Sequence, residues 1–149
     1  MILNKFKLQL VKESGRSYPQ YERGEVSSPD KVAELLFDLD VDKEPIESFY
    51  LILYDTRLKV IGLTKLSTGT INQSVVDIRS IMQTALLGNA YAIMLAHNHP
   101  SGDSRPSASD IYATRKVEEA AELLGMHMLD HIVIGHDRQY TSLKAEGHI

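Results

Sequence analysis

One segment, residues 91–124, constrains the fold more than any other part of the chain. Residues 91–96 form a short apolar run between turn-forming residues, which predicts a central β-strand. Residues 107–124 carry apolar side chains at helical spacing and stop at Gly125, which predicts the longest helix of the chain. A strand that leads through a loop into a long helix is typical of α/β domains, in which ligands bind beyond the carboxyl ends of the strands.

Hydrophobic patterning elsewhere adds further strands and helices. Residues 47–54 and 58–66, joined by a tight turn, predict a β-hairpin. The other predicted elements are a strand at 6–11, a helix from Pro29 to about Leu39 with Ser28 as N-cap, a helix at 77–87, a strand at 128–134 and a short strand at 139–143. We therefore expect one α/β domain at residues 29–149, a mixed β-sheet flanked by helices, preceded by an N-terminal strand and loop or arm at residues 1–28.

Composition narrows the possible functions. The 149 residues are enough for one domain with a proper core. No apolar run approaches the roughly 20 residues of a membrane span, so we expect no membrane partner. The net charge of −4 argues against direct nucleic-acid binding. The chain has no cysteine, so a metal site must use His, Asp or Glu, and a reducing cytoplasm is the expected compartment.

Two histidines and a carboxylate occur where the predicted central strand ends and the predicted long helix begins. In extended backbone, the side chains of His97 and His99 point to the same side while Asn98 faces away. Asp110 lies in the first turn of the following helix, across a loop rich in Pro, Gly and Ser. Two imidazole nitrogens and one carboxylate form a ligand set of catalytic zinc sites, which keep a fourth position for water. The three residues are therefore candidate ligands of one zinc ion.

Each part of this pattern also has a purely structural interpretation. Ser107 followed three residues later by Asp110 resembles a helix capping box, and an acidic residue in the first turn suits the helix dipole. A His-x-His pair at a strand end can also be two half-exposed side chains. The combination is more specific than its parts, because the pair must end a strand and the carboxylate must begin the next helix. Asp110 can serve both as a cap and as a ligand.

The same residues carry a resemblance to a known family. The JAMM motif, His-x-His-Pro, six residues, then Ser-x-x-Asp, is matched without a gap by His97, His99, Pro100, Ser107 and Asp110. The chain thus resembles the JAB1/MPN metalloproteases. The strings His-Asn-His-Pro-Ser-Gly-Asp at 97–103 and Leu-Asp-His-Ile-Val-Ile-Gly at 129–135 resemble the RadC-like branch, and the similarity runs from about residue 29 to residue 143.

Two features depart from that branch. Full-length RadC proteins carry an N-terminal helix-hairpin-helix region, where this sequence has a short predicted strand and loop. Residues 77–80 read Asp-Ile-Arg-Ser, where the branch usually shows His-Pro-Arg-Glu. The first departure weakens an inference to DNA binding, and the second leaves the candidate metal site untouched.

The resemblance implies a JAB1/MPN, cytidine-deaminase-like architecture and a zinc-dependent hydrolase. A metal-bound water would attack an amide or isopeptide bond in a peptide or protein substrate. The family's metal ligands carry over to His97, His99 and Asp110 on one zinc ion. The family's serine, which stabilises the transition state, carries over to Ser107.

The resemblance also implies a general base well upstream of the histidines. In the family, a glutamate at the start of the strand after the first helix has this role, and Glu47 occupies that place. Glu44 is the competing candidate, and a surface carboxylate at the end of a loop is the structural alternative for either. A positioned carboxylate of this kind takes the proton from the water and passes it to the leaving amine.

Metal-ligating imidazoles also need hydrogen-bond partners for their second nitrogen. Asp103, Ser101 and Asp130 are the candidates. We expect His131, on an apolar strand, to be a packed or hydrogen-bonded core histidine rather than a fourth ligand. The remaining histidines are expected at the surface: His127, His136 and His148.

Two functions from other classes compete with the hydrolase. One is a DNA-repair-associated role, which the RadC resemblance implies and which salt-dependent DNA affinity would support. The other is a non-catalytic peptide- or protein-binding module that retains the metal site, for which an exposed edge strand could capture an extended peptide. Bound zinc without turnover would favour the binding module.

Overall fold

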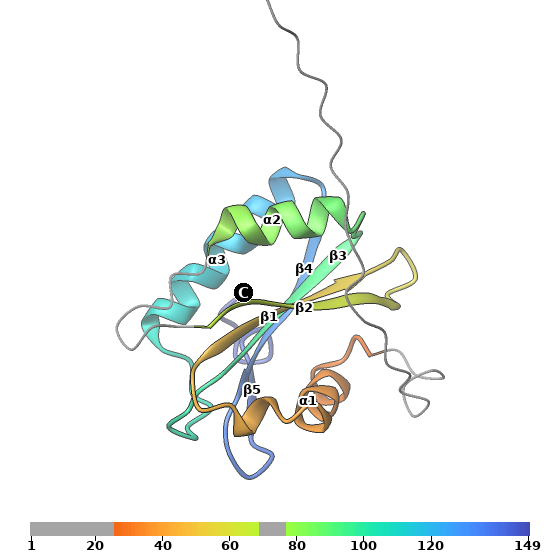
Figure 1. Cartoon of the computed structure of the whole chain (residues 1–149). Helices are drawn as coiled ribbons and strands as arrows, with labels where there is room; N and C mark the ends of the chain where they lie inside the picture. Colours follow the sequence, from red (N-terminus) through yellow and green to blue (C-terminus); the bar gives the residue numbers. More distant parts are fainter. Residues whose placement is uncertain (1–25, 69–76) are drawn as a thin grey trace, which may run out of the picture.

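Residues 26–68 and 77–149 are described by the computed structural model (Figure 1). The strand expected at 6–11, most of the arm expected at 1–28 and most of the loop expected at 67–72 lie outside the described residues. The described elements are, in chain order, α1 (Pro29–Asp38), the 3₁₀ helix η2 (Val41–Lys43), β1 (Ser48–Tyr54), β2 (Val60–Thr68), α2 (Ile78–Leu87), β3 (Ala92–Asn98), α3 (Ala108–Leu123), β4 (His127–Ile134) and β5 (Tyr140–Ser142).

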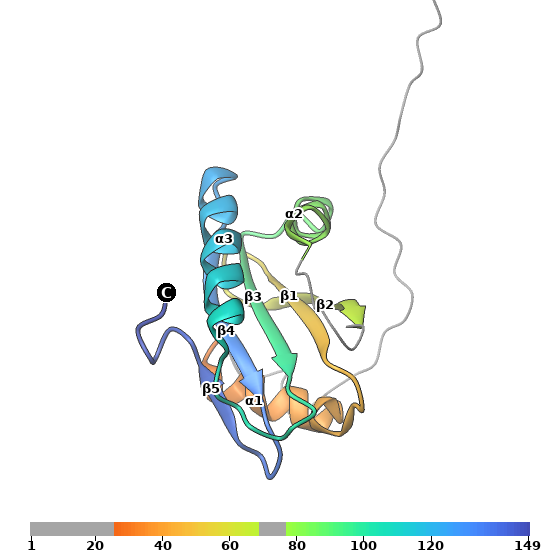
Figure 2. The same ribbon diagram turned by 90° about the vertical axis from the view of Figure 1, so that its left-hand side faces the viewer.

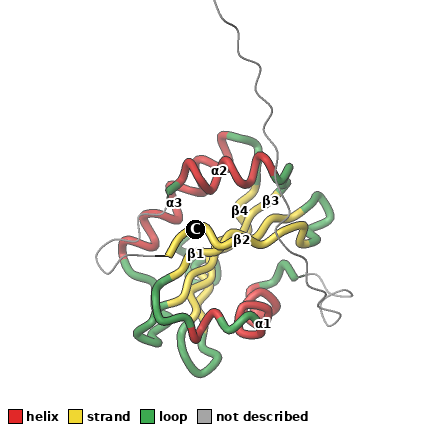
Figure 3. Tube along the Cα trace, in the orientation of Figure 1, coloured by secondary structure: helices red, strands yellow, loops and turns green. Residues whose placement is uncertain are grey.

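The helices and strands predicted within the described residues are present, with ends shifted by one or two residues (Figure 3). The largest shift at the start of a strand is in β2, which begins at Val60 rather than at Leu58. Leu58 adopts φ 56°, so it belongs to the hairpin turn, and the Asp55 carboxylate holds that turn by accepting hydrogen bonds from the main-chain N–H groups of Arg57 and Lys59. The short helix η2 was not predicted.

The five strands form one mixed sheet in the order β2-β1-β3-β4-β5. Strand β1 is antiparallel to both β2 and β3, whereas β3 and β4 are parallel and β5 is antiparallel to β4. Parallel neighbours require a crossover connection, and α3 supplies it between β3 and β4. Every residue of β1 and β3 is buried, as the continuous apolar runs predicted. The expected α/β fold with a mixed sheet is confirmed.

Helices cover both faces of the sheet, which makes a three-layer domain. Figures 1 and 2 show α2 and α3 together on one side and α1 on the other. The α1 layer packs on even-numbered residues of the central strands, among them Ile52 and Met94. The α2 and α3 layer packs on odd-numbered residues, among them Leu51, Ile93 and Leu95. Alternation along each strand therefore decides which layer a side chain meets.

Local signals set the helix ends. Asp77 caps α2, since its carboxylate accepts a hydrogen bond from the main-chain N–H of Arg79 at 3.1 Å. Asn89, just beyond α2, and Gly125, just beyond α3, both adopt the positive φ that ends a helix. Ser28 occupies the N-cap position of α1, but its side chain makes no capping hydrogen bond. Among the described residues, no helix combines the length and apolarity needed to cross a membrane.

Truncating the core at Ile93 is expected to destabilise the fold strongly. Ile93 is 0% exposed in β3, so Ile93→Ala removes buried methyl groups and leaves a cavity, which costs about 2–5 kcal/mol of unfolding free energy. Leu123 in α3 is 88% exposed, and Leu123→Ala should stay within about 0.5 kcal/mol of the parent. Denaturant unfolding of both variants measures the difference. Equal losses would contradict the assigned core.

Candidate metal centre

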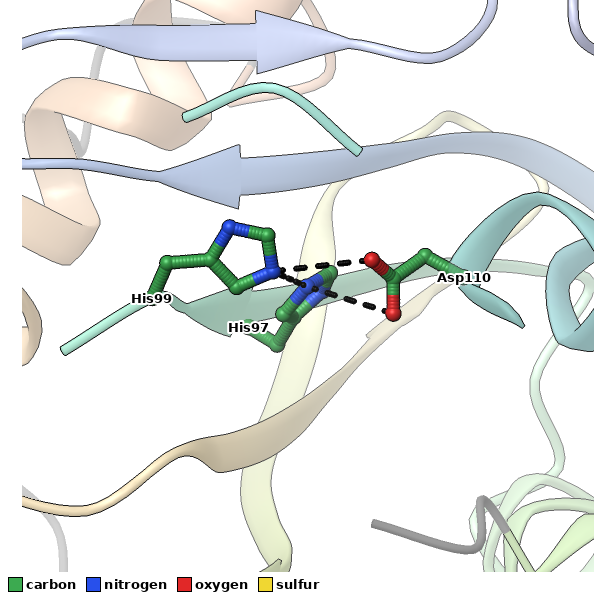
Figure 4. Close-up of side chains that lie close together, drawn as sticks. All are labelled: His97, His99 and Asp110. Atoms are coloured by element: carbon green, nitrogen blue, oxygen red, sulfur yellow. Dashed lines mark hydrogen bonds and ion pairs between the residues drawn. The ribbon is translucent and has the colours of Figure 1, made fainter. Parts of the chain in front are cut away.

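Strand β3 and helix α3 bring the three candidate ligands to one point (Figure 4). His97 lies in β3, His99 follows the strand directly, and Asp110 lies in the first turn of α3. Nε2 of His97 is 3.0 Å from Nε2 of His99 and 3.7 Å from Oδ1 of Asp110, and Nε2 of His99 is 3.5 Å from Oδ2 of Asp110. The three residues thus offer one ligand atom each, and these atoms all lie within 4.8 Å of one another.

These separations fit a tetrahedral metal ion. Zinc binds imidazole nitrogen and carboxylate oxygen at about 2.0–2.2 Å, so two of its ligand atoms lie about 3.3–3.6 Å apart. The nitrogen–nitrogen distance is 3.0 Å, and each imidazole has an Asp110 oxygen near that range, Oδ1 at 3.7 Å from His97 and Oδ2 at 3.5 Å from His99. Three protein ligands of this chemistry are the pattern of a catalytic site rather than a closed structural one. The cluster is therefore a candidate metal site.

Asp110 belongs to the candidate site and to the helix cap at the same time. Oδ2 of Asp110 accepts hydrogen bonds from the main-chain N–H of Ser107 at 2.7 Å and from the Ser107 hydroxyl at 2.6 Å. In return, the main-chain N–H of Asp110 donates a hydrogen bond to Ser107 Oγ. This is the expected capping box. Burial raises the pKa of Asp110, but the neighbouring imidazoles of His97 and His99 and the hydrogen bonds from Ser107 outweigh burial and lower the pKa far below its usual range.

The loop after His99 fixes the orientation of that ring. Nδ1 of His99 is 2.7 Å from the main-chain oxygen of Asp103, which can only accept, so in the neutral ring Nδ1 carries the proton and Nε2 keeps its lone pair for the cluster. Asp103 thus supports the site through its carbonyl. Its carboxylate instead pairs with Arg105, whose hydrogen bonds lower the pKa of Asp103 to about 2. Ser101 Oγ accepts a long hydrogen bond of 3.4 Å from the Asp103 N–H.

Side chains from the two strands that flank β3 hold the His97 ring in place. The ring stacks on Phe49 with centroids 4.6 Å apart and planes at 13°. Its Nδ1 lies 2.8 Å from Nε2 of His131, and Nδ1 of His131 lies 2.6 Å from the Thr114 hydroxyl. Burial lowers the pKa of His131 well below its ordinary value, and the imidazole is neutral. His131 is thus the hydrogen-bonded core histidine that its apolar strand predicted.

A β-bulge in β4 explains why His131, rather than Asp130, faces His97. Ile93 pairs with Met128 and Leu95 pairs with His131, so β4 holds one residue more than β3 over this stretch. The extra residue reverses the alternation, and the side chain of Asp130 is directed to other partners. Its carboxylate accepts hydrogen bonds from the main-chain N–H groups of His131 and Lys144. These contacts place Asp130 beside the β4–β5 region and not on the candidate ligands.

Asn98 faces away from the cluster, as expected, and binds the chain segment that leads into β1. Its Oδ1 accepts a hydrogen bond from the main-chain N–H of Ser48 at 2.8 Å. Its Nδ2 donates to the main-chain oxygens of Glu44 at 3.2 Å and of Ile46 at 3.3 Å. The residue between the two histidines therefore fixes the main chain on both sides of Glu47. No sequence signal identified these partners.

The register of β1 on β3 places Glu47 beside the cluster. Phe49 pairs with His97 at the end of the β1–β3 ladder, so Glu47, directly before β1, and His99, directly after β3, both lie just beyond that end of the ladder. The two side chains interact: Asp110 is the main cause that raises the pKa of His99, and the negative charge of Glu47 adds to it. Glu47 and His99 are 52 residues apart in the sequence and are thus neighbours in space.

Glu44, the competing candidate for a general base, is committed to other partners. Its carboxylate accepts a hydrogen bond from the Tyr50 hydroxyl and forms an ion pair with Lys65. Burial raises the pKa of Glu44, but the hydrogen bonds from Lys65, Ser48 and Tyr50 outweigh burial and lower it. Of the two carboxylates, Glu47 is therefore the one whose charge acts on a candidate ligand.

The remaining histidines lie apart from the ligand cluster. His127 is exposed at the start of β4, where its ring contacts Tyr91. His136 is exposed beside Gly102, and His148 is partly exposed and lies 3.4 Å from a carboxylate oxygen of Glu146.

Comparison with known proteins gives a consistent set of relatives. The UPF0758 protein of Desulforudis audaxviator is 40% identical over 122 residues, 82% of this chain and 52% of that protein. The UPF0758 protein of Desulfitobacterium hafniense is 37% identical over 140 residues, 94% of this chain and 60% of that protein. The UPF0758 protein of Alkaliphilus metalliredigens is 42% identical over 119 residues, 80% of this chain and 50% of that protein.

The chain spans about half to three-fifths of the length of these curated relatives. The family described as RadC-like JAB domain matches residues 26–148, which include all three candidate ligands, the capping box and Glu47. The fold, the candidate site and the relatives therefore agree, and the chain belongs to the RadC-like JAB domain family.

Proposed function

We propose that this domain is a zinc-dependent hydrolase that cleaves an amide or isopeptide bond in a peptide or protein substrate. The observation that carries the proposal is the convergence of His97 Nε2, His99 Nε2 and an Asp110 carboxylate oxygen within 4.8 Å of one another. Membership in the RadC-like JAB family supports it. When bound there, zinc would lower the pKa of a water to about 7 and polarise the substrate carbonyl.

The side chains around the ligands have roles that follow from their positions. Glu47, whose charge acts on His99, would accept a proton from the attacking water and donate it to the leaving nitrogen. The Ser107 hydroxyl would donate to the oxygen on which negative charge develops. In the structure this hydroxyl donates to Asp110 Oδ2, which also accepts the Ser107 N–H at 2.7 Å. The hydroxyl can therefore turn to substrate while the main-chain hydrogen bond keeps the cap in place.

Metal binding is the first test. The purified chain should bind one equivalent of zinc, and His97→Ala should abolish stoichiometric binding because it removes one of three ligands. His127→Ala, an exposed histidine at the other end of the neighbouring strand, is the matched control and should bind zinc like the parent. Elemental analysis after dialysis and chelator competition provide the measurement. Equal zinc content in both variants would overturn the assigned ligands.

Glu47→Gln should separate catalysis from metal binding. The amide keeps the size of the side chain but cannot act as a base, so kcat should fall by roughly 10²–10⁴ while zinc content is unchanged. Assays use mixed peptides and isopeptide-linked conjugates with the zinc-loaded chain. Glu44→Gln is the matched control, because it removes only the partly exposed ion pair with Lys65 and should change kcat little. A larger loss in Glu44→Gln would reverse the assignment of the base.

Ser107→Ala should affect both stability and rate. Loss of the cap is expected to cost about 1 kcal/mol of unfolding free energy. Loss of an oxyanion donor is expected to lower kcat by roughly 10²–10³. Asp77→Ala removes a side-chain cap from α2 and provides the control for the stability effect alone. If the two variants lose stability equally and neither loses rate, Ser107 is a cap without a catalytic role.

The competing functions give different results in the same assays. A metal-containing binding module would hold zinc but leave every peptide and isopeptide substrate intact, which would contradict the hydrolase. A direct role on DNA would require DNA affinity that falls steeply with salt concentration. The net charge of −4 argues against such affinity.

A further inference from the structure

His131 and Thr114 form a buried pair directly behind the candidate metal ligands. His131 lies in β4 and is 1% exposed, and Thr114 lies in α3, one turn after Asp110, and is fully buried. Neither residue offers an atom to the ligand cluster. Each contacts a ligand residue instead, because His131 touches the His97 ring and Thr114 touches the main chain of Asp110.

The direction of the hydrogen bonds in this pair can be deduced from the donors available. The Thr114 hydroxyl lies 2.6 Å from the main-chain oxygen of Asp110, which can only accept, so the single hydroxyl proton points there. The hydroxyl oxygen then accepts from Nδ1–H of His131 at 2.6 Å. A neutral imidazole carries one N–H, so Nε2 of His131 has a free lone pair. That lone pair accepts from Nδ1–H of His97 at 2.8 Å.

This direction leaves the correct nitrogen of His97 free. With the proton on Nδ1, Nε2 of His97 presents its lone pair toward His99 and Asp110, 3.0 Å and 3.7 Å away. If the chain of hydrogen bonds ran the other way, Nε2 of His131 would donate to Nδ1 of His97. The proton of His97 would then sit on Nε2 and point into the cluster, where it would block a metal ion.

We propose that His131 and Thr114 are positioning residues that hold His97 in the tautomer protonated at Nδ1 and thereby increase the affinity of the site for a metal ion. Residues behind metal-ligating histidines typically change metal affinity by roughly 10- to 100-fold when they are replaced. The proposal rests on the proposed metal site, but it concerns residues outside the ligand set. The same hydrogen bonds connect two candidate ligands, because they run from His97 through His131 and Thr114 to the main chain of Asp110.

Thr114→Val and Thr114→Ser form a matched pair of variants. Valine has nearly the shape of threonine but cannot accept from His131, so the imidazole of His131 loses the partner that fixes its proton on Nδ1. Serine keeps the hydroxyl. We expect Thr114→Val to weaken zinc binding by roughly 10- to 100-fold in chelator competition. Thr114→Ser should keep most of the parent's affinity for zinc, although it removes a buried methyl group.

A second measurement does not depend on bound metal. Long-range ¹H–¹⁵N spectra of the histidine rings in the zinc-free parent should show His97 and His131 protonated at Nδ1 and unprotonated at Nε2. In Thr114→Val the two rings should shift toward the opposite tautomer, which a purely structural role of Thr114 would not cause.

The possible results of these two experiments distinguish a failure of the positioning role from a failure of the proposed hydrolase function. A parent that binds zinc, with equal affinity in Thr114→Val, would overturn the positioning role and leave the metal site intact. A zinc-free parent with His97 protonated at Nε2 would also overturn it. A parent that shows the expected tautomers but binds no zinc would refute the proposed function, and the effect on affinity with it.

Discussion

The pairing of β3 on both of its edges determines what surrounds the candidate site. On one edge, the antiparallel register with β1 stacks Phe49 on His97 and brings Glu47 near enough for its charge to act on His99. On the other edge, the parallel register with β4 brings His131 beneath His97. A slip of one residue in either register would turn these side chains to the opposite face. Burial of all of β3 makes such a slip costly, so the core that stabilises the fold also holds the site.

The N-terminus of α3 joins stability and chemistry in one group. Asp110 closes the capping box with Ser107 and offers an oxygen to the ligand cluster. The N-terminal end of a helix favours negative charge, so the carboxylate stays ionised without a metal ion. The neighbouring imidazoles and the hydrogen bonds from Ser107, which lower the pKa of Asp110, act in the same direction. A capping role and a ligand role therefore reinforce each other, and the presence of one is no evidence against the other.

The sequence was sufficient for the order of elements and for the meeting of a strand end with a helix start, because both follow from local periodicity and capping residues. It was insufficient wherever a contact depends on register. Alternation counted along β4 cannot reveal the bulge that directs His131, and not Asp130, toward His97. The partners of Asn98 lie about 50 residues earlier in the chain. Gly102 reads as an ordinary loop residue, yet it needs φ +86° and a Cβ there would lie 2.6 Å from the His136 ring.

Burial around the cluster is one-sided, and this asymmetry bears on how a substrate would reach it. The His97 side chain is 0% exposed, closed in by Phe49 and His131, whereas the His99 side chain is 16% exposed. Glu47, whose charge acts on His99, is also partly exposed. The accessible side of the cluster is therefore the side of His99, the histidine on which the charge of the proposed general base acts. A substrate carbonyl approaching from that side would meet Glu47 and His99 first, while His97 and the pair behind it stay in the dry interior, where hydrogen bonds hold their geometry most firmly.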